Sequence, residues 1–305
     1  MGSPSTPLVK LDKQSHVIWR TKIGVHHAID VVGDRIYALT DDAKLARTEE
    51  SFRRPHRPVA RRLKRVTGVP YSRESVTIFD ADGRALSTHS IMGAIINTDD
   101  ASLVEVVQSK ARQGGRQNLH SNSLNVLTDQ TAHFIPGAKP GNVLVSLRNL
   151  NMLLVMDLET NKVIWALRGN WREQHDAKML PNGHILLFDN SGDLMDHGRS
   201  RVLEIDPRTG GIVWSYGGTH NDPLDSADNR GGAQRLANGN TLINEANAGR
   251  ILEVTPDHKV VWEFVDQSQT EIRGEYIASL GVSVHRYDPS YVKFLRTDKN
   301  PVATH

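Results

Sequence analysis

The chain has no cysteine among its 305 residues, which excludes disulfide bonds, thiolate metal sites and a cysteine nucleophile. It also has no run of 18 apolar residues, so no transmembrane helix is predicted. Neither sign of charge is in excess, because 37 Lys and Arg face 35 Asp and Glu, a net charge of +2. A surface that binds polyanions over its whole extent is therefore not expected. With 38% hydrophobic and 24% charged residues, the composition is typical of a globular protein with a large core.

Several familiar functional motifs are also missing. The sequence contains no HExxH, GxxxxGK[ST] or GxSxG motif, no GxGxxG after a strand, and no EF-hand spacing. Its first residues show no basic segment followed by an apolar run, so no signal peptide is expected in this chain. These absences turn attention to patterns that recur along the sequence.

Four of the five tryptophans lie at the same place in a repeated segment. The segments are HVIWRT, KVIWAL, GIVWSY and KVVWEF, and they contain Trp19, Trp165, Trp214 and Trp262. Before the last three lie a short strand and a turn with residues such as Asp-Pro or Thr-Gly, which favour hairpins. A related segment without tryptophan spans Val76–Leu86. One hairpin of a repeated unit is therefore predicted around each tryptophan.

In each unit another hairpin lies before the one that contains the tryptophan. The segments MLPNGHILLF and RLANGNTLI carry Asn-Gly, the strongest short-range signal for a hairpin turn. Two hairpins make a four-stranded antiparallel sheet, and a period of 40–50 residues with four strands is typical of propeller blades. The sequence thus predicts an all-β fold, a single β-propeller.

The units begin near His27, His120, His175 and Gly231, and a partial unit spans Arg273–Tyr287. The amino-terminal segment supplies only the later hairpin of a unit. We therefore expect it to pair with the carboxy-terminal partial unit and close the ring, which would leave no open sheet edge. This gives five blades, or six if the interval 33–120 contains further strands.

One domain is expected over residues 1–305, with a basic loop inserted at about 41–75. The loop contains SFRRPHRPVARRLKRV, which suits either a solvated loop or a cationic lid near an anionic substrate. It lacks interleaved aromatic residues, so nucleic-acid binding is disfavoured.

A column of unlike residues marks the start of the first strand of each unit. Aligned on their apolar positions, these strands place His27, Asn122, His175 and Gly231 in one column. The first strand of a propeller blade is the innermost, and His120 points to the same face as Asn122 because side chains alternate. A lone histidine there could be a hydrogen-bonded or solvated ring, but several polar residues at one end of a channel favour a site.

Three further residue sets have more than one interpretation. Arg148 lies on an otherwise apolar predicted strand, where a buried charge needs either an anionic ligand or a neighbouring carboxylate. The pair His26–His27 could suggest a metal, but no matching acidic or histidine cluster accompanies it, and no metal is predicted. Asp189 and Asn190 are interpreted as residues that fix a loop.

Taken in order, the segments LHSNSLNVL, VLVSLRNLN and QHDAKMLPNGHILLFDN resemble the arylsulfotransferases, a family with a β-propeller fold. The resemblance is close over about residues 119–265 and weaker but in register over HHAIDVV and VTIFDADGRAL. It implies transfer of a sulfuryl group between phenols by a ping-pong route through a sulfohistidine, without a nucleotide or metal cofactor. The implied partners are small molecules, an aryl sulfate donor and a phenolic acceptor.

The resemblance also implies roles for individual residues. His175 corresponds to the family's nucleophile, His120 and Asn122 to its HxN pair, and Arg148 to its SxR arginine. His27 corresponds to the histidine of an earlier blade, with His26 as the alternative and as a residue that binds substrate. Compartment stays open: periplasmic or secreted if a leader has been removed, otherwise cytoplasmic.

The residues themselves suit this chemistry. A neutral imidazole is a competent nucleophile near neutral pH, and an arginine fork can bind two sulfuryl oxygens. Two other functions fit the same pattern: a propeller that binds an anionic ligand or protein partner without catalysis, and an arylsulfatase-like hydrolase with water as acceptor.

Overall fold

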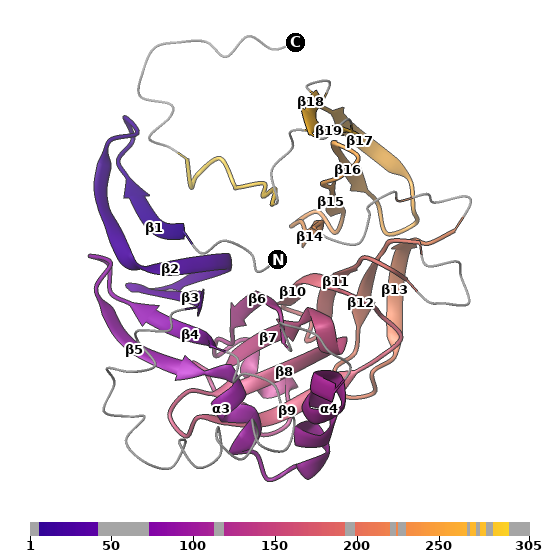
Figure 1. Cartoon of the computed structure of the whole chain (residues 1–305). Helices are drawn as coiled ribbons and strands as arrows, with labels where there is room; N and C mark the ends of the chain where they lie inside the picture. Colours follow the sequence, from indigo (N-terminus) through magenta and orange to yellow (C-terminus); the bar gives the residue numbers. More distant parts are fainter. Residues whose placement is uncertain are drawn as a thin grey trace.

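The computed structural model describes most of the chain, and the following account is confined to residues 6–41, 73–112, 119–192, 199–219, 224, 230–266, 269–272, 275–278 and 283–292. Residues 42–72, which contain most of the predicted basic loop, lie outside this part. Four antiparallel sheets follow one another around an arc, each a propeller blade of four or five strands (Figure 1).

The first two blades hold the strands that precede His175. The first blade consists of β1 (Thr6–Leu11), β2 (Val17–Val32), β3 (Arg35–Asp41), β4 (Glu74–Phe79) and β5 (Ala85–Ser90). The second blade consists of β6 (Ser121–Val126), β7 (Val143–Leu147), β8 (Met152–Asp157) and β9 (Lys162–Arg168).

The third and fourth blades repeat the same order of strands. The third consists of β10 (His175–Met179), β11 (Ile185–Asp189), β12 (Arg201–Ile205) and β13 (Ile212–Gly217). The fourth consists of β14 (Gly232–Arg235), β15 (Thr241–Glu245), β16 (Arg250–Val254) and β17 (Val260–Val265), and a separate hairpin of β18 (Gln269–Ile272) and β19 (Glu275–Ala278) follows. The unit starts predicted near His120, His175 and Gly231 therefore coincide with the first strands of the second, third and fourth blades, whereas the start predicted near His27 lies inside β2.

The predicted number of blades and the predicted ring closure are wrong for the described residues. Four blades are present rather than five or six, and β18 and β19 pair with each other rather than with an amino-terminal strand. The reason lies in β2, a single strand of 16 residues. Its first half pairs with β1 and its second half with β3, so the amino-terminal hairpin continues the first blade.

Helices occupy the interval in which additional strands were expected. They are α3 (Ile91–Ile96) and α4 (Ala101–Arg112). Ser90 ends β5 and begins α3, because its hydroxyl accepts a hydrogen bond from the Gly93 backbone N–H at 3.0 Å, a standard helix N-cap. Leu103 and Val107 of α4 are buried, so the helix packs its apolar side against the blades. Among the described residues, no helix is long and apolar enough to cross a membrane.

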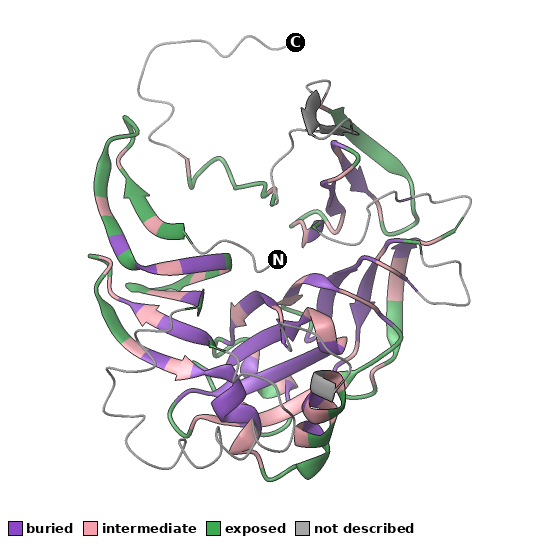
Figure 2. Cartoon of the chain, viewed as in Figure 1, coloured by how far each residue is buried: buried purple, intermediate pink, exposed green. Residues whose placement is uncertain are grey.

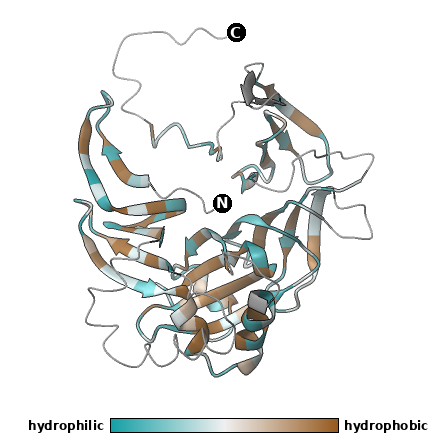
Figure 3. Ribbon diagram, in the orientation of Figure 1, coloured by the Kyte–Doolittle hydropathy of each residue, from teal (hydrophilic) through white to brown (hydrophobic). Residues whose placement is uncertain are grey.

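The core lies between neighbouring blades and is formed by their middle strands. Every residue of β7, β8 and β11 is buried, whereas every residue of β17 is exposed (Figure 2). Hydropathy follows the same division in the second blade, where apolar colour covers most of β8 (Figure 3). A strand covered on both faces needs no polar face, which explains unbroken runs such as MLLVM in β8.

Two of the repeated tryptophans bond to a hairpin turn, and one of these bonds links two blades. The indole N–H of Trp19 donates to the carbonyl of Ala81, and that of Trp214 donates to the carbonyl of Pro256, both at 3.0 Å. Pro256 lies in the β16–β17 turn of the fourth blade, whereas Ala81 lies in the β4–β5 turn of the sheet that also holds Trp19. At Trp214 the repeated residue therefore marks a contact between the third and fourth blades.

A second joint also recurs, built from an arginine, a glutamate and a tryptophan. Arg235 pairs with Glu204 at 2.6 Å, and its guanidinium lies 4.9 Å above the Trp214 ring. One unit further on, Arg286 pairs with Glu253 and lies 5.3 Å above the Trp262 ring. The segment 283–292 thus contacts the fourth blade as β14 contacts the third.

Candidate functional site

Three of the predicted histidines meet where the inner strands begin. The His27 ring lies 5.1 Å from the His120 ring, measured between centroids. His175 and Arg148 are close enough to His120 to lower its pKa electrostatically. The structure therefore brings together side chains from β2, β7–β8, β10 and the segment before β6, as the column in the sequence predicts.

Each of these inner strands carries a non-glycine residue with positive φ. The φ angles are 57° at His27, 52° at His120 and 53° at Asp176. The pairing register shifts across His27 in β2 and across Asp176 in β10, and in β6 it shifts at Asn122, two residues after His120. Such bulges interrupt the regular alternation of side chains along a strand. Here they occur on the inner strands of three blades, next to the histidines that lie near one another.

The adjacent histidines 26 and 27 have different surroundings. His27 is exposed and faces His120, whereas His26 is buried with 8% of its surface accessible. Their Nδ1 atoms are 2.8 Å apart, so one ring donates a hydrogen bond to the other. His26 thus lies behind His27 and supports it.

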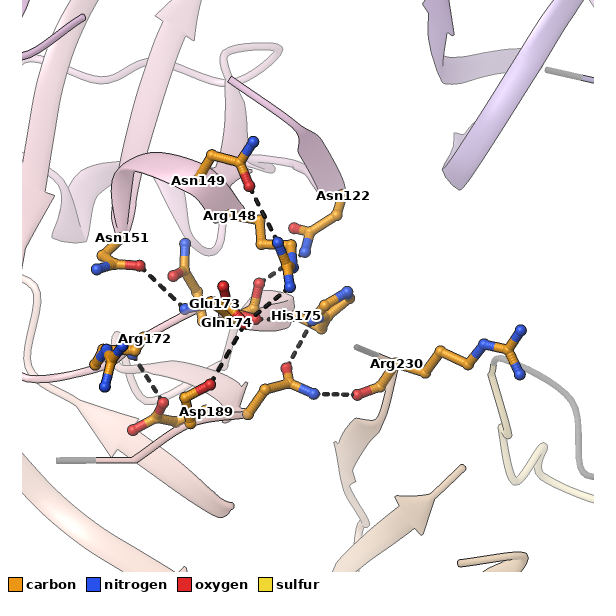
Figure 4. Close-up of polar contacts among 12 residues, drawn as sticks. Asn122, Arg148, Asn149, Asn151, Arg172, Glu173, Gln174, His175, Asp189 and Arg230 are labelled. Carbon is orange, nitrogen blue, oxygen red and sulfur yellow. Dashed lines mark hydrogen bonds and ion pairs between the residues drawn. The ribbon is translucent and has the colours of Figure 1, made fainter. Parts of the chain in front are cut away.

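The His175 ring is buried and held on one side. Its Nδ1 lies 3.0 Å from the carbonyl oxygen of Glu173 and 2.6 Å from Oδ1 of Asn190 (Figure 4). The loop before the ring is fixed by Asp189, which accepts the backbone N–H of Arg172 at 2.8 Å. Position and orientation of the ring are therefore determined by the loop 172–174 and by the end of β11.

Arg148 does not lie on a strand as predicted. β7 ends at Leu147, and Arg148 begins a single 3-10 turn that is closed by the Asn151 N–H, which donates to the Arg148 carbonyl at 3.2 Å. The backbone N–H of Arg148 itself donates to the His120 carbonyl at 3.1 Å. Its guanidinium pairs with the Glu173 carboxylate at 2.8 Å and donates to Oδ1 of Asn149 at 3.1 Å (Figure 4). The carboxylate partner that sequence reasoning left open is therefore present, and it belongs to the loop that carries His175.

Asn122 is buried and turned toward the same loop. Its amide nitrogen donates to the Gln174 carbonyl at 2.7 Å, and its Oδ1 has no hydrogen-bond partner among the described residues. The side-chain amide of Gln174 donates in turn to Ser146 at 3.0 Å and to the Met152 carbonyl at 3.1 Å. This network ties the loop before His175 to the second blade.

Close packing explains why the fourth blade has glycine, Gly231, where other blades have histidine or asparagine. Gly231 has φ of 106°, and a Cβ atom added to it would lie 2.7 Å from the Phe188 ring. No other residue fits there without displacing that ring. The exception in the fourth blade therefore reflects close packing.

The histidine rings lose part of their contact with water at this site. Burial is the main cause that lowers the pKa of His120 to about 4, with Arg148 and His175 adding to the effect. The pKa of His27, which remains the most exposed of them, is also lowered, by the partial burial of its ring and then by the neighbouring histidines. Burial also lowers the pKa of His175, against a smaller opposing effect of its hydrogen bond to Asn190. At pH 7 these imidazoles therefore each offer one lone pair and one N–H.

Sequence reasoning missed two acidic residues at this site. Glu173 has φ of 57°, pairs with Arg148 and gives its carbonyl to His175. Glu74 accepts the backbone N–H of His120 at 3.0 Å and that of Ser121 at 2.6 Å, which fixes the start of β6. Glu173 stands two residues before His175, but only the left-handed backbone brings it to Arg148.

No group of three or more His, Asp or Glu side chains suited to a metal ion occurs in the described part of the chain. No protein with a curated description matches the sequence. Solved structures with some likeness include virginiamycin B lyase from Staphylococcus aureus, at 11% identity and a TM-score of 0.41, covering 79% of this chain and 55% of that one.

Two others give similar values. An inactive variant of the same lyase with quinupristin has 12% identity and a TM-score of 0.43 over 87% of this chain and 60% of that one. The WD40 β-propeller domain of Doa1 has 10% identity and a TM-score of 0.39 over 76% of this chain and 52% of that one. The chain therefore spans about half to three-fifths of the length of these proteins.

A sequence model of a protein family gives the decisive comparison. The arylsulfotransferase (ASST) family matches residues 83–267, which is more than half of the chain. The match includes His120, Arg148 and His175 with the second, third and fourth blades, and it leaves out His26 and His27. The chain belongs to the arylsulfotransferase family.

Proposed function

We propose that this protein transfers a sulfuryl group from an aryl sulfate to a phenolic acceptor, with His175 as the covalent carrier. One observation carries the proposal. A buried imidazole with a depressed pKa, two further neutral histidines and an arginine gather at one end of the inner strands. Such a set can attack an anionic ester and stabilise the charge that develops.

In the first step, a ring nitrogen of His175 attacks the sulfur of the aryl sulfate. The N–S bond forms as the bond between sulfur and the aryl oxygen breaks, and the phenolate leaves with the electron pair. Neutral histidines are weak acids, so His27 and His120 stabilise the phenolate by donating hydrogen bonds rather than by protonating it outright. Arg148 presents its planar fork to two sulfuryl oxygens.

In the second step, an acceptor phenol attacks the same sulfur. The new S–O bond forms, the N–S bond breaks, and His175 regains its lone pair. The proton of the phenol passes to the free lone pair of a neutral histidine, such as His120, and from there to water. No nucleotide takes part in either step.

Asn122 and His26 are assigned supporting roles. The Asn122 amide on β6 is already bonded to the Gln174 carbonyl, so we assign this residue to holding the loop that positions His175. His26 is buried behind His27 and acts through it.

A burst experiment tests the proposal. Mixing the protein with a chromogenic aryl sulfate and no acceptor should release one phenol per active site, and a second phenol should start turnover. Peptide mapping at mildly basic pH, where an N–S bond survives, should place the sulfuryl group on His175. His175→Ala should abolish burst and label, whereas His133→Ala, which removes an exposed histidine of the same sequence region, should change neither.

Other outcomes would lead elsewhere. Steady release of phenol without an acceptor would identify a hydrolase. Binding of the ester without any release would identify a non-catalytic anion-binding propeller. A label on His27, His120 or a tyrosine would contradict the assignment of the carrier.

A further inference from the structure

Asn190 stands directly after β11 and is locked on three sides. Its side chain is 98% buried, since only 2% of the residue is accessible. Its backbone carbonyl accepts the Ser200 hydroxyl at 2.6 Å, and its amide nitrogen donates to the carbonyl of Arg230. Its remaining amide atom, Oδ1, lies 2.6 Å from Nδ1 of His175.

These contacts determine where the His175 proton lies. A backbone carbonyl only accepts, so the Asn190 atom facing Arg230 must be the NH₂ group and the atom facing His175 must be the oxygen. The second neighbour of Nδ1 is the Glu173 carbonyl, at 3.0 Å, which is also an acceptor only. With two acceptors beside it and no donor to it among the residues that the structure describes, Nδ1 carries the hydrogen, and the lone pair of the neutral ring lies on Nε2.

We infer that Asn190 is a positioning residue that selects Nε2 of His175 as the atom that takes the sulfuryl group. The inference rests on the proposed function, because it assigns the attacking atom of that reaction. Attack through Nε2 leaves a ring with sulfur on Nε2 and hydrogen on Nδ1, which is formally an imidazolium. The oxygens of Asn190 and Glu173 then face its N–H and stabilise its positive charge.

The repeat separates this role from a structural one. The residue before it, Asp189, pairs with Arg201 at 2.9 Å, and the corresponding Glu245 of the fourth blade pairs with Arg250. That ion pair recurs because it serves the blade. At the next position the fourth blade has Ala246, so a blade without a catalytic histidine needs no amide there.

The tautomer can be measured without substrate. Protein labelled with ¹⁵N at histidine should show, by long-range ¹H–¹⁵N correlation at pH 7, a protonated Nδ1 and a bare Nε2 for the His175 signal, assigned by its loss in His175→Gln. In Asn190→Leu the Nε2–H form should become populated. The burst of phenol should slow about 10–100-fold, the usual effect of removing a partner of this kind. The label should be on Nε2 in the wild type.

Asn142→Leu is the matched control. Asn142 is as buried as Asn190, with 2% of each residue accessible. It holds the turn before β7 by accepting the Lys139 N–H at 2.9 Å, and this turn lies at the opposite end of β7 from Arg148. It should leave the tautomer and the burst unchanged. If Asn190→Leu does not fold, the wild-type spectrum and the linkage of the label still decide the matter.

The two proposals fail separately. An Nε2–H tautomer in the wild type, a label on Nδ1, or an unchanged burst in folded Asn190→Leu would overturn the role of Asn190 and leave the sulfohistidine route standing. Absence of any adduct from a protein that shows the Nδ1–H tautomer would overturn the proposed function, while the assignment of the proton would stand.

Discussion

Removing Arg148 should lower turnover by about 10²–10³-fold, the usual cost of one charge-stabilising donor lost from an active site. The structure adds a second effect. Glu173 pairs with Arg148 at 2.8 Å, so Arg148→Ala leaves a carboxylate facing the place where the sulfuryl oxygens should sit. Arg148→Lys should also be poor, because a point charge cannot replace the planar fork.

The size of this repulsion follows from the geometry. A carboxylate and a sulfate that flank the same guanidinium are about 5 Å apart, and two like charges at that distance repel by about 0.8 kcal/mol at a dielectric constant of about 80. This corresponds to about a fourfold change in affinity. Glu173→Gln removes this repulsion and should therefore bind an aryl sulfate about fourfold more tightly. The substitution keeps the backbone carbonyl that contacts His175, so the position of the ring should not change. The double variant Arg148→Ala/Glu173→Gln should regain the same factor relative to Arg148→Ala.

Affinity is best measured where chemistry cannot follow binding. In a His175→Ala background, calorimetry gives the dissociation constant of the aryl sulfate for all four combinations, and turnover is measured in the parent background. Melting curves should show that each variant is folded. Wild-type turnover in Arg148→Ala would mean that this arginine is only structural, and weaker binding by Glu173→Gln would refute the electrostatic reasoning.

Three further predictions concern stability, pH and the donor. Trp214→Ala should reduce the free energy of unfolding by about 3 kcal/mol, because the indole packs between blades and donates to Pro256. Trp262→Ala should reduce it by only about 1 kcal/mol, because Trp262 is 43% exposed and its main contact is with Arg286. Equal losses in urea titrations of the two variants would contradict this. Burial lowers the pKa of His120 to about 4 and also lowers the pKa of His175. The value of kcat/KM for the donor should therefore stay level as pH falls through 6.5 and decline only near pH 4. An inflection at pH 6.5 would instead show that an essential histidine is exposed. The free energy of unfolding should fall as pH is lowered from about 6.5 to about 4, because the histidines of the unfolded chain bind protons in this range and those of the folded site do not. Thermal melts from pH 7 to pH 4 measure this. Rates of the burst should increase with the acidity of the leaving phenol, because neutral histidines only donate hydrogen bonds to it; a series of substituted aryl sulfates showing no such dependence would oppose that view.

The repeat made the blades and the family predictable, and local patterns explain why. Asn-Gly turns and the spacing of Trp165, Trp214 and Trp262 are properties of short segments, and they mark strands and contacts between neighbours. The number of blades depends on whether distant ends of the chain pair, which no local pattern encodes. The continuous strand β2 decides that question for the amino-terminal hairpin.

The site was predictable in its members but not in its geometry. Alternation of side chains along a strand does not hold at these strand starts, because φ is positive at His27 and His120 and the pairing register shifts at Asn122. Glu173 was missed because its contact with Arg148 depends on a left-handed loop residue. Helices α3 and α4 were missed because a search for repeats passes over a segment that occurs once.

The arginine–glutamate–tryptophan joint also bears on how such a molecule grows. Glu204 and Trp214 lie on one blade and Arg235 on the next, and Glu253, Trp262 and Arg286 follow the same division. The fourth blade therefore carries both halves of this contact, with Arg235 directed at the blade before it and Glu253 and Trp262 at the segment after it. When a gene segment of this length is duplicated in tandem, the new copy arrives with both halves already complementary to its neighbours. Blades could thus be gained or lost in evolution without inventing an interface each time, while residues at the strand starts diverged to build a reaction centre.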